Sequence, residues 1–175
     1  MFVAVRKRKI QCGRAVARAT ASEHGTEAVI LRFFNVYGQG QDPTSAYSGV
    51  VSKFMERVAQ GLPPVMYGDG LQTRDFVHVN DAVAAIIAGL TREVRPGLTV
   101  NIGSGKATSV VELARAIARL GGSALEPQSA PAREGDVRHS VADIGLARKE
   151  LGYAPQTGLE EGLRQTWEWF RGRRQ

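Results

Sequence analysis

The sequence predicts an α/β fold built around parallel strands, and three observations support this prediction. Residues 28–34, AVILRFF, are apolar except at Arg32, which is typical of a strand buried on both faces of a parallel sheet. Residues 98–104, LTVNIGS, repeat this pattern. Both runs lead into glycine turns, and amphipathic helical patterns follow them, as in folds that alternate strands with helices.

The first half of the chain is predicted to contain two helices and two strands. Residues 14–24, rich in Ala and Arg, form a helix closed by a glycine, and strand 28–34 follows it. Helix 47–60 presents one apolar face and stops at a glycine before two prolines. In PVMYGDG, residues 64–70, a short strand meets a glycine turn.

The middle of the chain is predicted to contain a strand followed closely by a helix. TRDFVHV, residues 73–79, alternates polar and apolar side chains as a strand does. DAVAAIIAGL, residues 81–90, has the composition of a buried helix, and Asn80 or Asp81 is expected to cap its first turn.

The last part of the chain is predicted to be mainly helical after the strand 98–104. Ser109 and Glu112 have the spacing of a capping box for helix 110–120. Residues 123–142 are expected to be loop-rich, and helix 143–151 ends at a glycine. A final helix carries one apolar stripe, made of Leu159, Leu163, Trp167 and Phe170.

Composition places the chain among ordinary globular domains. It has 175 residues, of which 43% are hydrophobic and 23% charged, enough for a single core. The single cysteine, Cys12, excludes an internal disulfide, so we expect a reducing, cytoplasmic compartment. No apolar run is long enough to span a bilayer or to serve as a secretory signal, so we expect no membrane association.

The net charge of +6 is concentrated near the N-terminus. Residues 1–32 contain seven of the basic residues and two acidic ones, including the run RKRK at 6–9. Such a run is usually a solvated segment. Nucleic-acid binding is the alternative, but no nucleic-acid-binding module accompanies the run, so we do not favour it.

The glycine-rich segments do not match the phosphate-binding motifs. NIGSGKATS, residues 101–109, has Val100 and Ala107 where a P-loop requires Gly and Ser or Thr. Three G-x-G pairs lack the third glycine of a dinucleotide-binding turn; they are Gly38/Gly40, Gly68/Gly70 and Gly103/Gly105. The scattered histidines give no predicted metal site, and we expect His78 to be structural.

Four polar residues stand where a ligand could reach them. Asn35 ends the strand 28–34, and its carboxamide both donates and accepts hydrogen bonds. Arg74 follows a glycine turn, while Arg133 and Asp136 lie three apart in a loop. Two arginines with a carboxylate suit a diphosphate and a ribose. Surface ion pairs are the alternative interpretation.

Four segments, which we call the family segments, together indicate a family. They are LRFFNVYGQGQDP (31–43), VMYGDGLQTRDFVHVNDA (65–82), VNIGSGKATSVVELA (100–114) and PAREGDVRHSVADIGLARKELGYAP (131–155). In order and spacing the chain resembles the C-terminal part of the extended short-chain dehydrogenase/reductases. The resemblance is strongest to the NAD-dependent sugar-nucleotide epimerases and dehydratases of the UDP-glucose 4-epimerase type.

The resemblance covers the chain from about residue 14 onwards and implies an architecture. Residues 14–175 would form the last strands of a Rossmann-like parallel sheet and a small mixed α/β substrate-binding subdomain, after an atypical basic segment, 1–13.

The resemblance also implies roles for seven residues. Phe34 would lie near the nicotinamide; the nucleoside-diphosphate sugar, most simply a UDP-sugar, would be bound by Asn35, Val65, Tyr67, Arg74, Arg133 and Asp136.

The chain departs from the family pattern where catalysis takes place. The family's Tyr-x-x-x-Lys pair would fall at Arg6 and Ile10, its glycine-rich NAD turn has no counterpart here, and Gln39 replaces a usual proline. We therefore predict no catalytic residue in this chain. NAD serves the full-length family, but we do not expect this chain alone to bind it.

Three interpretations follow from this combination. The first is a truncated epimerase or dehydratase, from a split or misread gene, that keeps its substrate half-site and is inactive alone. The second is a non-catalytic module that binds nucleoside-diphosphate sugars. The third is an interaction protein whose uncovered strand 28–34 pairs with a separate N-terminal half or with a second copy.

Overall fold

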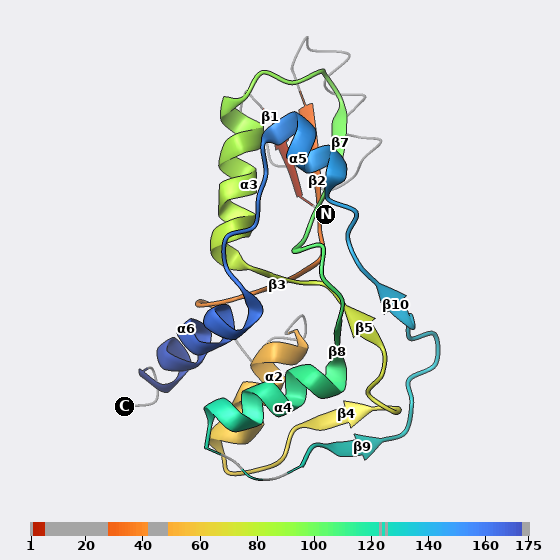
Figure 1. Cartoon of the computed structure of the whole chain (residues 1–175), viewed down its shortest axis with the longest axis vertical. Helices are drawn as coiled ribbons and strands as arrows, with labels where there is room; N and C mark the ends of the chain where they lie inside the picture. Colours follow the sequence, from red (N-terminus) through yellow and green to blue (C-terminus); the bar gives the residue numbers. More distant parts are fainter. Residues whose placement is uncertain (1, 6–27, 42–48, 123, 125, 173–175) are drawn as a thin grey trace.

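The computed structural model describes residues 2–5, 28–41, 49–122, 124 and 126–172 (Figure 1). The predicted helix 14–24, the RKRK run and the positions Arg6 and Ile10 lie outside the described residues. The elements fall into two groups, one around a three-stranded sheet and one around three packed helices.

The first group consists of a sheet and two helices, which confirms the α/β prediction. Its elements are β1 (Phe2–Val5), β2 (Ala28–Phe33), α3 (Val79–Thr91), β7 (Leu98–Ile102) and α5 (Gly145–Leu151). The strand order is β1-β2-β7, and β2 and β7 are parallel. Figure 1 shows α3 and α5 beside this sheet, and apolar residues from β2, β7, α3 and α5 form one core cluster.

The strand β2 is the centre of the sheet. Its first four residues are buried, and Arg32 is exposed, where it donates two hydrogen bonds to the Asn101 carboxamide on β7. On the side of β2 away from β7, β1 pairs with it antiparallel, and Phe2 lies opposite Leu31. The prediction that strand 28–34 has an uncovered edge is therefore wrong, because residues 2–5 occupy that edge.

The second group is built from three helices and several short strands. They are β3 (Asn35–Tyr37), α2 (Val50–Ala59), β4 (Val65–Tyr67), β5 (Thr73–Arg74), β6 (Phe76–His78), β8 (Thr108–Ser109), α4 (Val110–Leu120), β9 (Gln128–Ala130), β10 (His139–Ser140) and α6 (Leu159–Gly172). β3 pairs with β6 and β4 with β9, both in parallel, while β5 lies between β10 and β8. The segment 123–142, predicted as loop-rich, thus contains two short strands.

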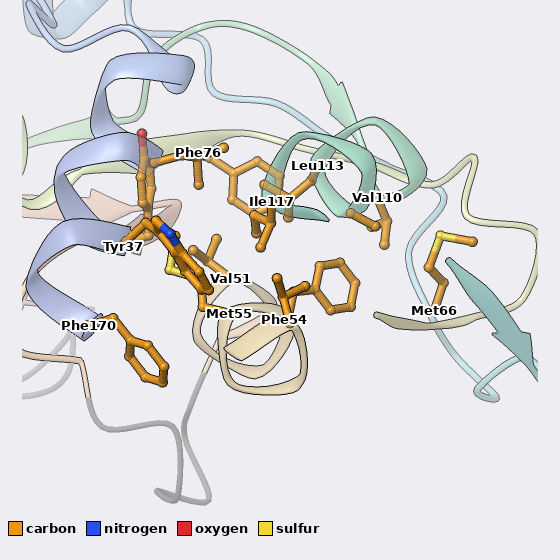
Figure 2. Packing of buried hydrophobic residues seen from close by; sticks show 14 residues of the cluster. Tyr37, Val51, Phe54, Met55, Met66, Phe76, Val110, Leu113, Ile117 and Phe170 are labelled. Atoms are coloured by element: carbon orange, nitrogen blue, oxygen red, sulfur yellow. The ribbon is translucent and has the colours of Figure 1, made fainter. Parts of the chain in front are cut away.

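Helices α2, α4 and α6 share a second apolar core (Figure 2). The expected faces are the buried ones: Phe54 and Met55 on α2, and Leu163, Trp167 and Phe170 on α6. Between them lie the apolar residues of α4, whose helix begins at the predicted capping box. In this core α2 packs on α4, which also contacts β4, and this arrangement positions the cavity described below.

Asp75 splits the predicted strand 73–79 into two. It is fully buried between β5 and β6, and its carboxylate accepts four hydrogen bonds. The donors are the N–H and hydroxyl of Ser104 and the N–H groups of Gly105 and Ala142, at 2.6–3.1 Å. The carboxylate therefore ties the β5–β6 junction to the glycine turn after β7 and to the loop before α5.

The cap of α3 differs from the prediction. The helix begins at Val79, so His78 is its cap, and His78 Nδ1 accepts from the Asn80 N–H at 3.4 Å. Asp81, one of the two predicted caps, instead accepts from the backbone N–H groups of Gln156 and Thr157. The carboxylate thereby fixes the chain entering α6, a long-range contact that local spacing does not reveal.

The helices of the described residues are short or interrupted by charged side chains. None of them has the length and apolar character needed to cross a membrane.

Candidate functional site

Six predicted substrate-binding residues line one cavity of about 230 Å³. They come from separate parts of the chain: Asn35 from β3, Val65 and Tyr67 from β4, Arg74 from β5, and Arg133 and Asp136 from the loop after β9. Helix α2 supplies a further wall through Val50, Lys53 and Phe54. The remaining lining residues are Met66, Gln72 and Val110.

One end of the cavity is formed by an aromatic ring with a cation on its face. The Arg133 guanidinium lies 3.8 Å from the centre of the Tyr67 ring, in a cation–π contact. The parallel pairing of β4 with β9 makes this contact possible, because Tyr67 lies opposite Ala130, three residues before Arg133. The hydrogen bond and the charge of Arg133 lower the pKa of the Tyr67 phenol, and the more distant charge of Lys53 does the same.

A polar network forms another part of the cavity wall. Arg74 pairs with the Asp136 carboxylate and donates to the Val137 carbonyl at 2.6 Å. Gln72, only 8% exposed, donates through Nε2 to the Tyr67 carbonyl at 2.9 Å and to the second Asp136 oxygen at 3.5 Å. These contacts hold a guanidinium and a carboxylate side by side and link them to the strand that carries Tyr67.

Asn35 and Phe34 are adjacent in sequence but separate in the fold. The Asn35 side-chain amide donates to the Asp75 carbonyl at 3.0 Å, which anchors the exposed carboxamide at the cavity. Phe34 is partly buried against the core cluster of the sheet and does not line the cavity. Its predicted place near a nicotinamide stays a prediction.

One glycine turn of the described residues has no N–H groups left to bind a phosphate. In the turn Gly103–Gly105 the N–H groups of Ser104 and Gly105, which could bind a phosphate, already donate to Asp75. A side-chain Cβ at Gly103 would lie 2.5 Å from an Asp75 oxygen, so this glycine serves the internal carboxylate. Among all the residues that the structure describes, there is also no group of three or more potential metal ligands.

A larger cavity, of about 780 Å³, lies between α4 and α6. It contains none of the predicted site residues. One of its cations, Arg164, is paired with Glu161 and Glu168 at 2.7 and 2.6 Å. Lys106, Arg119 and Glu160 also line it, so the smaller cavity is distinguished by the convergence of the predicted site residues rather than by polarity alone.

Comparisons with known proteins decide the family. Residues 8–103, more than half of the chain, match the model of the NAD dependent epimerase/dehydratase family. The chain belongs to this family. The dTDP-L-rhamnose 4-epimerase of Burkholderia thailandensis is 42% identical over 156 residues, which cover 89% of this chain but 43% of that protein.

Solved structures of the epimerase/dehydratase family share the fold. The UDP-glucose 4-epimerase of Thermotoga maritima, solved with UDP-glucose, matches 93% of this chain and 52% of its own, with 38% identity and a TM-score of 0.86. The UDP-glucose 4-epimerase of Thermus thermophilus, solved with NAD, matches 88% and 50%, with 38% identity and a TM-score of 0.74. The chain thus spans about half the length of its relatives.

Two polar lining residues, Gln72 and Lys53, are not among the site residues predicted from the sequence. Gln72 lies inside the family segment VMYGDGLQTRDFVHVNDA, and its position between Tyr67 and Arg74 is the only sequence signal that could have indicated it. Lys53 lies in a helical pattern and outside every family segment, so only the structure, in which α2 and β4 line the same cavity, reveals it.

Proposed function

We propose that this chain binds a nucleoside-diphosphate sugar, most simply a UDP-sugar, as the substrate-binding half of an NAD-dependent sugar-nucleotide epimerase or dehydratase. The observation that supports it most strongly is the convergence of six residues on one cavity. Chance surface ion pairs, the alternative interpretation, would not bring an aromatic ring, two arginines, a carboxylate and a carboxamide together.

Each of these side chains has a proposed role that matches its chemistry. The Tyr67 ring, 41% exposed, offers a stacking surface for the nucleobase beside Val65. Arg74 and Arg133 bind the diphosphate, since a guanidinium pairs with phosphate through two parallel hydrogen bonds. Asp136 accepts hydrogen bonds from the ribose hydroxyls.

The reaction of the family requires groups that this chain does not supply. NAD, when bound, accepts and returns hydride, and a Tyr assisted by a Lys moves the proton. At the corresponding positions this chain has Arg6 and Ile10. The described residues bind and orient the sugar nucleotide but hold no group placed to move its proton, so we propose that the chain alone has no turnover.

Calorimetry with UDP-glucose tests the binding function. We expect the 175-residue chain to bind UDP-glucose without added NAD, and Arg133→Ala to weaken binding about tenfold or more, because it removes a charge-assisted contact. Arg115→Ala is the matched control, since Arg115 lies on α4 outside the cavity and pairs with exposed Glu126. Absence of binding to any nucleoside-diphosphate sugar would refute the proposal.

A further inference from the structure

Lys53 is a third cationic side chain on the candidate cavity. It lies in the first turn of α2, between Val50 and Phe54, and these three residues form the helical wall of the cavity. Its side chain is exposed, and its positive charge lowers the pKa of the Tyr67 phenol, though less than Arg133 does. Lys53 therefore lines the same cavity as Tyr67 and Arg133.

The position of Lys53 is unfavourable for the helix by itself. The first turn of a helix is its positive end, where acidic side chains are stabilising and lysines are not. Helix α2 has no acidic residue in this turn, and Gly49 provides no side-chain cap. Lys53 thus adds positive charge to a helix end that is already positive, and helix stability does not explain it.

The cavity has more positive than negative side chains. Arg74 is neutralised by its ion pair with Asp136. Within the part of the chain that the structure describes, neither Lys53 nor Arg133 forms an ion pair with a carboxylate. Three cations and one carboxylate leave an excess of two positive charges, and two cations on one cavity without a carboxylate partner can bind an anion.

We propose that Lys53 binds the diphosphate of the sugar nucleotide together with Arg133. This inference rests on the function proposed above. A diphosphate bridging a nucleoside and a sugar carries two negative charges at neutral pH, which balances the excess in the cavity. A lysine ammonium is a mobile point charge suited to phosphate oxygens, and its four-carbon stem spans the distance from an exposed helix position.

The test compares Lys53→Met with Lys149→Met, which removes the same charge from an exposed position on α5 outside the cavity. We expect Lys53→Met to weaken UDP-glucose binding about twofold to fivefold, as for an exposed charged contact. The loss should shrink at high salt because screening weakens such contacts. Lys149→Met should bind as the unmodified chain does, and Lys53→Arg should retain most of the affinity.

Uridine, which has no phosphate, separates the possible roles of Lys53. Ligand-observed NMR should show uridine binding unchanged by Lys53→Met. An equal loss for uridine and UDP-glucose would overturn the proposal, because it would assign Lys53 to the nucleobase or to the fold. Equal affinities of Lys53→Met and Lys149→Met would overturn it as well. If the unmodified chain binds no UDP-glucose, the proposed function itself fails, and this inference fails with it.

Discussion

Asp75 is the residue on which the surroundings of the candidate site depend. Its buried carboxylate accepts four hydrogen bonds and lies directly after Arg74, which lines the cavity. Because every donor points at one of its two oxygens, the interaction requires a group that only accepts hydrogen bonds. The glycine turn, which a sequence motif could have assigned to phosphate, is occupied by a carboxylate of the same chain.

Asp75→Asn should therefore destabilise the fold strongly. An amide has one acceptor oxygen, so either Ser104 or the Gly105 and Ala142 pair would face an NH₂ group instead. We expect the free energy of unfolding to fall by about 2–4 kcal/mol, because buried donors would lose their partners. Urea unfolding measures this loss. Glu134→Gln, at an exposed loop position, is the control, and an equal effect in both variants would contradict the assignment.

His78 should make stability depend on pH. The ring is fully buried, and burial lowers its pKa, while the charges of Asp81 and Glu161 oppose the shift more weakly. Nδ1 accepts from Asn80, so Nε2 carries the proton, and Nε2 has no partner within the described residues. The neutral ring is thus the form that fits the fold.

The sign of the pH effect follows from this lowered pKa. Above the unfolded-state pKa of about 6.5, the neutral His78 ring makes its full contribution to the free energy of unfolding. This contribution is lost as the pH falls through the lowered pKa of the folded state, because protonation then favours the unfolded chain. His78→Asn keeps a good cap but does not titrate. Between about pH 7.5 and about pH 5, a range that brackets the usual His pKa, the unfolding midpoint should fall more for the unmodified chain than for this variant. Parallel curves would show that His78 does not titrate in this way.

At the scale of elements, helix α4 depends on its capping box. Ser109 accepts from the Glu112 N–H, and the Glu112 carboxylate accepts from the Ser109 N–H at 2.9 Å. Ser109→Ala should lower the free energy of unfolding by about 1 kcal/mol, because a helix N–H loses its partner. The hydrogen bonds that the Glu112 carboxylate accepts from the N–H and the hydroxyl of Ser109 lower the pKa of Glu112, so their contribution is present above its usual pKa and lost in acid. Denaturant titration at about pH 7 and about pH 3, on either side of an ordinary carboxyl pKa, checks both statements.

Helix α6 closes the second core, and Leu163 is its central contact. The side chain is fully buried in the cluster shared by α2, α4 and α6. Leu163→Ala should cost about 2–5 kcal/mol, because it removes buried methyl groups and leaves a cavity. Leu146→Ala on α5, 39% exposed, is the matched control and should cost much less. Thermal unfolding of the two variants measures the difference.

Elements with strong local signals are predictable from the sequence, and those fixed by distant contacts are not. Buried strand β2, the capping box of α4 and the stripe of α6 each have a periodic or spacing signal of their own. The split at Asp75 depends on Ser104, and the engagement of Asp81, which leaves the cap to His78, depends on Gln156; both partners lie far along the chain. No local pattern contains that information.

The same distinction applies to the candidate site. The resemblance to the family indicates six cavity-lining residues in advance, because each lies in a family segment. It does not indicate Gln72, whose importance depends on its hydrogen bonds to Tyr67 and Asp136, or Lys53, which the packing of α2 places there. The family segments therefore indicate these six residues, while Gln72 and Lys53 are recognised only in the structure.

At the scale of the whole molecule, this chain carries the proposed substrate-binding residues of the family without its catalytic pair, which predicts ligand binding without turnover. The cavity lies in the group of elements around α2 and β4, whereas the sheet group contains Phe34 and the glycine turn that Asp75 occupies. We expect the purified chain with NAD to convert no UDP-glucose to UDP-galactose while it still binds UDP-glucose. Chromatographic separation of the two sugar nucleotides after long incubation measures turnover, with a full-length UDP-glucose 4-epimerase as the positive control. Measurable epimerisation, proportional to the concentration of this chain and lost in Arg133→Ala, would mean that its own residues supply the base and the cofactor site.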